Sequence, residues 1–98
     1  MEEKIEKVLK KLGLKPEGKY NNHFYVIPVA NSDDYAKMYT LLSKNAVNTE
    51  FPEFTKNTND TTIKVVNYFE LEVDSVIYDI FLIADFDNDN YYVKIGER

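Results

Sequence analysis

Asp85, Asp87 and Asp89 alternate along one short stretch, and carboxylates spaced in this way can bind a calcium ion. A calcium loop uses acids at its positions 1, 3 and 5, a turn residue at 6 and a bidentate glutamate at 12. Counted from Asp85, Asn90 would stand at position 6, but Gly96 stands where the glutamate is required. Asn and Asp also tolerate the left-handed backbone of a tight turn between two strands. We therefore predict a hairpin turn here and no metal site.

Other residue types that carry catalysis are sparse. The single histidine, His23, stands alone after "YNN", where it is more often a surface or capping residue than a base. Glu70 and Asp79 could act as an acid–base pair, but they are expected on a flat sheet with no visible pocket. The three glycines form no phosphate-binding loop. We therefore expect no enzyme activity and no cofactor.

Length and composition indicate one globular domain spanning residues 1–98. Apolar residues make up 44% of the chain and aromatic residues 14%, which is enough for a modest core. The chain has no cysteine, so disulfides, thiolate metal sites and thiol catalysis are excluded. No apolar run approaches the roughly 18 residues of a membrane span, and the charged start "MEEKIEKVLKK" is unlike a signal peptide. We expect a cytoplasmic protein that does not enter a membrane.

Negative charge is concentrated in the C-terminal half. Residues 1–45 hold eight lysines and six acids, a net charge of +2, whereas residues 46–98 hold four basic and eleven acidic side chains, a net charge of −7. The acidic half repels phosphate, and a single arginine offers little bidentate contact to bases. Direct nucleic-acid binding is therefore disfavoured, and a protein with a basic surface is the expected partner.

Two amphipathic helices are expected. In residues 2–12 the apolar side chains recur at i, i+3, i+4 and i+7, and Gly13 follows where a left-handed residue ends a helix. Residues 31–45 begin with Asn31 or Ser32 as the N-cap and carry acids in the first turn, where the helix dipole favours them. Each helix has one apolar side that can cover a sheet.

Shorter segments between and after the helices are predicted to be strands and a loop. Residues 23–30 are rich in aromatic and β-branched types, but Pro28 cannot donate to a ladder, which places this strand at an edge or at a bulge. Residues 46–54 could hold a short strand that ends at Pro52. The polar, Asn-rich residues 55–62 are predicted to be a loop.

The last third of the chain predicts an antiparallel meander of three strands, at about 63–74, 76–86 and 91–95. Two-residue turns at Asp74-Ser75 and Asn88-Asp89 would fix the register of both hairpins. The expected pairs are Val73 with Val76, Leu71 with Tyr78, Phe69 with Ile80 and Val65 with Ala84 in the first hairpin, and Leu82 with Ile95, Ala84 with Val93 and Phe86 with Tyr91 in the second. All these pairs fall on one mostly apolar face, which the helices would cover.

The opposite, outward face of the meander mixes rings, aliphatic side chains and carboxylates, a pattern typical of protein-binding surfaces. Glu70 would lie opposite Asp79, which costs stability because like charges approach to about 5 Å. Changing Glu70, Glu72 and Asp79 to lysine is therefore expected to leave the fold intact or slightly more stable. The predicted partner-binding residues are Tyr68, Glu70, Glu72, Asp79, Phe81, Ile83, Asp85 and Tyr92.

The apolar residues of this outward face could instead be core, covered by the segment Phe51–Phe54 or by a helix, with the acids as ordinary solvated edges. Two copies of the chain could also pair through the face as a homodimer, which would make the chain an accessory subunit. A calcium or small-ligand site is the remaining alternative function.

The expected fold class is α+β, with two helices packed on one face of an antiparallel sheet of four to five strands and the meander at its C-terminal end. The expected function is a small acidic protein-binding or inhibitory module, whose carboxylates stand in for phosphates on a basic surface such as one that binds nucleic acid. In composition the chain is similar to small inhibitors carried by phages and mobile elements, such as anti-CRISPR proteins and toxin-immunity proteins. That similarity implies inhibition by binding.

Overall fold

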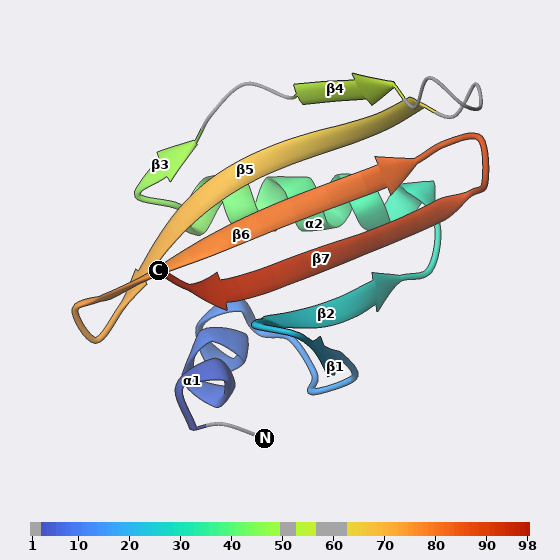
Figure 1. Ribbon diagram of the computed structural model, residues 1–98. Helices are drawn as coiled ribbons and strands as arrows, with labels where there is room; N and C mark the ends of the chain where they lie inside the picture. The colour runs from blue at the N-terminus through green and yellow to red at the C-terminus, as the bar shows by residue number, and fades with distance from the viewer. Residues whose placement is uncertain (1–2, 50–52, 57–62) are drawn as a thin grey trace.

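The computed structural model describes residues 3–49, 53–56 and 63–98, and the side chains of residues 3–47 and 65–98. The described residues form two helices and seven strands (Figure 1). Their bounds are α1 (Glu3–Leu12), β1 (Lys19–Asn21), β2 (Phe24–Val29), α2 (Ser32–Asn45), β3 (Asn48–Thr49), β4 (Glu53–Lys56), β5 (Ile63–Val73), β6 (Val76–Asp85) and β7 (Asn90–Glu97).

All described strands belong to one antiparallel sheet in the order β1-β2-β7-β6-β5-β3, and β4 also pairs with β5. Strands β2, β7, β6 and β5 form its body, because β1, β3 and β4 have only three, two and four residues. Strands β3 and β4 both pair with β5 and together take one edge position of the sheet. The four long strands and this edge position match the expected four to five strands. Strand β1 is a short additional strand that pairs with β2. The predicted α+β class and C-terminal meander are confirmed.

Helix α1 ends as its sequence predicts. Gly13 is left-handed, with a φ of 70°. Its N–H donates to the Lys10 carbonyl (3.2 Å), and the N–H of Leu14 donates to the Leu9 carbonyl (2.8 Å). These two bonds form a Schellman motif, which satisfies carbonyls at the end of a helix. The predicted apolar stripe of α1 is buried, at Ile5, Val8, Leu9 and Leu12.

Helix α2 is capped by Asn31, whose Oδ1 accepts a hydrogen bond from the Asp34 N–H (2.8 Å). Within α2 only Leu42 is fully buried. Its other apolar residues pack against the core while staying half-buried, at Tyr35, Met38 and Leu41. Helix α2 therefore covers the sheet less tightly than α1.

The first hairpin of the meander has the predicted register. Val73 pairs with Val76, and the other predicted pairs of β5 with β6 are also observed. The turn residues Asp74 and Ser75 have φ values of 52° and 66°, and a two-residue type I′ turn requires positive φ at both positions. The two-residue turn predicted from the sequence is therefore correct.

The register predicted for the second hairpin is wrong by two residues, because Leu82 lies opposite Val93 and not Ile95. Ala84 pairs with Tyr91 in place of Val93, whereas Phe86 has no strand partner, because residues 86–89 form a loop in place of the two-residue turn. A type I′ turn needs left-handed backbone at both of its central residues, but of the two predicted ones only Asp89 has it (φ 49°). A shift of two residues keeps every side chain on its predicted face.

Strand β2 lies between β1 and β7, but β1 reaches only as far as Val26. Pro28, opposite Tyr92 of β7, therefore lies where β2 forms the edge of the sheet, as its missing N–H predicts.

The segment between α2 and β5 contains the short strand predicted in residues 46–54, which is β3. Strand β4 was not predicted, because Thr55 and Lys56 belong to the polar stretch that was expected to be a loop. The rest of that predicted loop, residues 57–62, lies outside the described residues, as do Phe51 and Pro52.

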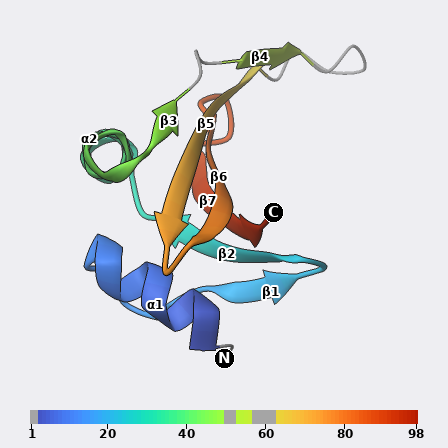
Figure 2. The same ribbon diagram turned by 90° about the vertical axis from the view of Figure 1, so that its left-hand side faces the viewer.

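The core lies between the two helices and one face of the sheet, and Figure 2 shows both helices to one side of β5, β6 and β7. Neither described helix is long and apolar enough to cross a membrane. The largest fully buried side chains are Tyr78, Phe69, Leu42, Leu71, Ile80, Leu82, Ile95, Val8 and Val93. The other face of the sheet is covered by neither helix.

Candidate functional site

The face of the sheet that points away from the helices arises from strict alternation along its strands. Because every second residue of β2, β5, β6 and β7 enters the core, the residues between them point outward. We call this the outer face. Its register brings the eight predicted partner-binding residues together across neighbouring strands, with Tyr68 opposite Phe81, Glu70 opposite Asp79 and Ile83 opposite Tyr92.

Arg98 joins the two opposed carboxylates of this face. Its Nη2 donates to Glu70 Oε1 (2.7 Å) and to Asp79 Oδ1 (2.8 Å). The hydroxyl of Tyr68 lies among these groups, where it donates to Asp79 Oδ1 and accepts from Arg98. The predicted repulsion between Glu70 and Asp79 is therefore offset by a cation that sequence reasoning did not place there.

The same contacts favour the protonated forms of Tyr68 and Arg98. The pKa of Tyr68 is raised to about 12, first because burial disfavours the phenolate and then because Asp79 accepts its hydrogen bond and repels its negative charge. Hydrogen bonds to Glu70 and Asp79 raise the pKa of Arg98 above its usual range. Near neutral pH the cluster therefore holds a neutral phenol and a fixed cation.

Aromatic rings cross the outer face from β2 to β5. Phe24 meets Phe81 edge-on with centroids 6.0 Å apart, and Phe81 meets Tyr68 at 5.2 Å. The ammonium group of Lys94 lies 5.7 Å from the centroid of Phe24 and 6.0 Å from that of Tyr92, a cation–π arrangement. All four rings are half-buried, so they keep surface for a partner.

Two predicted partner-binding residues, Ile83 and Asp85, are buried, with 7% and 5% of their surface exposed. Asp85 holds the loop of the second hairpin: its Oδ2 accepts from Asn88 Nδ2 (2.9 Å) and its Oδ1 from the Asn88 N–H (3.3 Å). Neither side chain offers a partner much contact, so the accessible part of the outer face excludes both.

Glu72 is the exposed acid of the outer face. Its backbone carbonyl accepts a hydrogen bond from Lys11 of α1 (2.8 Å), and the nearby Asp74 forms an ion pair with Lys7 (3.0 Å). These contacts hold α1 against the first hairpin. Among the described residues no cation lies within ion-pair distance of the Glu72 carboxylate.

The alternating aspartates of residues 85–89 belong to a hairpin loop. Asp85 is buried at the base of the loop, whereas Asp87 and Asp89 are exposed within it. Across the described ranges, no three acidic or histidine side chains gather closely enough to share a metal ion. His23 is exposed in the turn between β1 and β2. The alternating aspartates therefore lie in a hairpin connection, but it is the loop of residues 86–89 and not the predicted two-residue turn.

Sequence reasoning left two contributors out of this surface, Phe24 and Arg98. The signal for Arg98 was present, because it continues the outward phase of Tyr92 and Lys94 in steps of two residues. Phe24 could not be found in this way, since nothing in the sequence places β2 beside β7. No protein-family model, curated protein or solved structure matches the chain.

Proposed function

We propose that this chain is a protein-binding module that docks through its outer face on the basic surface of another protein. The observation that carries the proposal is the placement of Phe81, Glu70 and Asp79 together on a face that neither helix covers. Had Phe81 been packed under a helix, or had the two carboxylates pointed to opposite sides of the sheet, this docking surface would not exist.

The charge of the outer face suits a basic partner even with Arg98 in place. The surface has three carboxylates, at Glu70, Glu72 and Asp79, against two described cations. The described contacts of Asp79 all use Oδ1, so Oδ2 is available to a donor from the partner. Complementary charge speeds encounter and makes association salt-sensitive. A chain docked in this way covers the basic surface, so the proposed effect is inhibition.

The size of the outer face suits a partner that extends beyond the sheet. Its four long strands have 6, 8, 10 and 11 residues. At about 3.3 Å per residue and 4.8 Å between strands, the face covers roughly 550 Å². Two copies packed face to face would cover roughly 1,100 Å² of flat area, close to the lower limit of the range of about 1,200–2,000 Å² for stable complexes. A partner that also reaches the strand ends can bury more.

The proposal is tested by comparing what two variants capture from a lysate of the source organism. Glu72→Lys with Phe81→Gln changes the outer face. Glu3→Lys with Tyr39→Gln makes the same change of charge and also replaces an aromatic ring by an amide, at exposed positions of the two helices. We expect the first variant to lose the proteins that the wild type captures and the second to keep them. Captured proteins should also dissociate as salt is raised.

Equal capture by the wild type and both variants would refute the outer face as the docking surface. Thermal melts of each variant check that the fold is intact. Sedimentation at several concentrations separates the alternative function, because a dimer that persists in high salt would instead indicate self-association through this face.

A further inference from the structure

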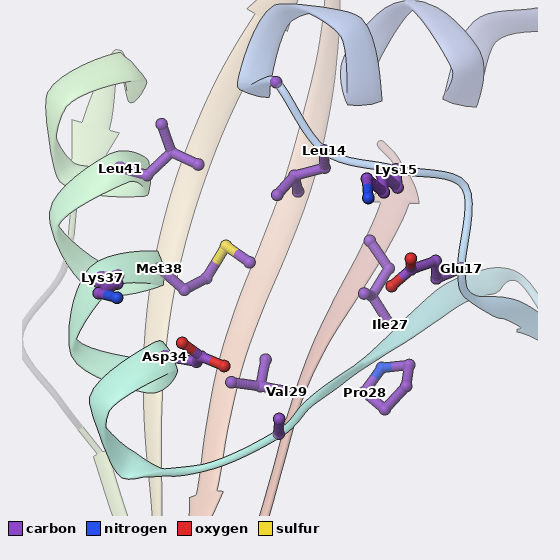
Figure 3. A pocket seen from close by; sticks show the side chains of 12 residues that line it. Leu14, Lys15, Glu17, Ile27, Pro28, Val29, Asp34, Lys37, Met38 and Leu41 are labelled. Atoms are coloured by element: carbon purple, nitrogen blue, oxygen red, sulfur yellow. The ribbon is translucent and has the colours of Figure 1, made fainter.

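A groove on the helix side of the sheet is separate from the outer face (Figure 3). It lies between the connection that follows α1, the end of β2 and one side of α2, and it encloses about 390 Å³. A volume of this size, within the range of about 300–1,000 Å³ typical of ligand sites, accommodates several apolar side chains. Its floor is apolar and consists of Leu14, Ile27, Val29, Met38 and Leu41.

Two carboxylates face this groove from opposite walls. In Figure 3 the carboxylate of Asp34 points from α2 toward Val29, and that of Glu17 points from the other wall toward Ile27. Neither carboxylate forms an ion pair with a described residue. Their negative charge beside an apolar floor is complementary to a ligand that combines apolar groups with a cation.

Two lysines also line the groove, Lys15 and Lys37, and both are exposed. Long lysine side chains keep their ammonium groups in water while their stems cover apolar surface. Glu17 is exposed as well, whereas Asp34 is half-buried, so the least accessible charge of the groove is the Asp34 carboxylate. A cationic side chain of a ligand would contact the carboxylates when the apolar side chains next to it enter the groove.

The wall formed by β2 argues against a ligand that adds a strand. Strand β1 ends opposite Val26, so the following part of β2 is an edge. Pro28 lies in this part and has no N–H to offer an added strand. Contacts through side chains, as when an amphipathic helix lies in a groove, are favoured here.

We propose that this groove binds a basic amphipathic helix of a partner protein. Apolar side chains of that helix enter the floor, and its lysine or arginine residues meet Asp34 and Glu17. The site is independent of the outer face, because Ile27 and Val29 point toward the helices whereas the outer-face residues of β2 point away from them.

Fluorescence anisotropy with a labelled leucine–lysine amphipathic peptide of about fourteen residues tests this proposal. The groove variant combines Asp34→Asn with Glu17→Gln, and the control variant combines Asp33→Asn with Glu3→Gln. Both variants change the net charge equally, and Asp33 is exposed in the same helical turn as Asp34. We expect the groove variant to bind about tenfold more weakly and the control to change by less than about twofold.

Equal losses in the two variants, or no binding to the wild type, would overturn the proposal. Met38→Gln places an amide at the floor of the groove and should by itself weaken peptide binding. This variant tests the proposal if the double variant fails to fold. A concentration-dependent dimer that Met38→Gln abolishes would assign the groove to a second copy and would also overturn the proposal. The outer-face variant, with Glu72→Lys and Phe81→Gln, should keep its peptide affinity; loss of that affinity would place the peptide on the outer face instead.

Discussion

Replacing Asp85 by alanine tests whether the alternating aspartates form a turn or a metal loop. The buried Asp85 carboxylate accepts hydrogen bonds from Asn88 at 2.9 and 3.3 Å. A hydrogen bond to a charged group contributes about 1.5–3 kcal/mol, and part of the total is offset because burial of a carboxylate is unfavourable. We therefore expect a loss of about 2 kcal/mol in the free energy of unfolding, which lowers the Tm by roughly 8–16 °C for a domain of this size.

A double-mutant cycle isolates the contribution of the side-chain contact. Asn88→Ala removes the bond from Nδ2 and keeps the one from its N–H, so its coupling to Asp85→Ala should be about 1 kcal/mol. Urea and thermal unfolding are measured with a chelator and again with added calcium, and a turn requires the same Tm in both. A calcium-dependent rise in Tm that Asp85→Ala abolishes would refute the turn, and a coupling near zero would refute the assigned contact.

Four further perturbations test the packing and the charges. Arg98→Met leaves Glu70 and Asp79 opposed without their cation, so melts followed by circular dichroism should show a lower Tm, most clearly at low salt. For the same reason, changing both carboxylates to lysine should lower the Tm, contrary to the expectation from sequence. Because the pKa of Tyr68 is raised to about 12 in the fold, its contribution to stability should be complete below pH 10 and decline from pH 10 toward pH 12; Tyr68→Phe should flatten that decline in urea unfolding. Leu42→Ala truncates the buried side chain of α2 and should lower the free energy of unfolding by about 2–5 kcal/mol in the same assay.

Alternation along β5 and β6 was the most informative pattern in the sequence. A slip of one residue would have turned Phe69, Leu71 and Ile80 from the core to solvent. Burial of these side chains therefore determined which residues face the core. The turn at Asp74-Ser75 then fixed the remaining choice of register. Local chemistry and the hydrophobic pattern agreed at this hairpin, and the predicted pairs are correct.

The second hairpin shows why knowing which residues face the core does not by itself set the register. Shifts of two residues bury the same side chains, so the loop decides between them. The stretch after Asp85 contains several residues that tolerate left-handed backbone, and the sequence does not say which of them adopts it. The bonds from Asn88 to the Asp85 carboxylate accompany the longer loop, and such a side-chain contact is visible only in three dimensions.

The outer face was predicted as a surface, but its electrostatics were not. The opposition of Glu70 and Asp79 follows from counting along one hairpin, whereas Arg98 lies beyond the predicted strand of residues 91–95. The shift of the second hairpin does not explain the missed contact, because a shift of two residues keeps Arg98 in the outward phase. Arg98 was missed because the predicted strand ended before it, and the reach of its side chain to both carboxylates is visible only in three dimensions. With this cation in place, a loss of stability is the expected effect of changing these acids to lysine.

Strand β2 connects the two proposed surfaces, because its side chains alternate between them. Phe24 belongs to the outer face, whereas Ile27 and Val29 form part of the groove floor. The two surfaces therefore share a strand and no side chain, so both can be occupied at once. An outer-face variant should then leave the affinity of the groove for its ligand unchanged, and a groove variant should leave that of the outer face unchanged, since distant sites without shared partners act independently. Coupling between them would mean that binding on one side shifts β2, whose edge is unsupported by β1 beyond Val26.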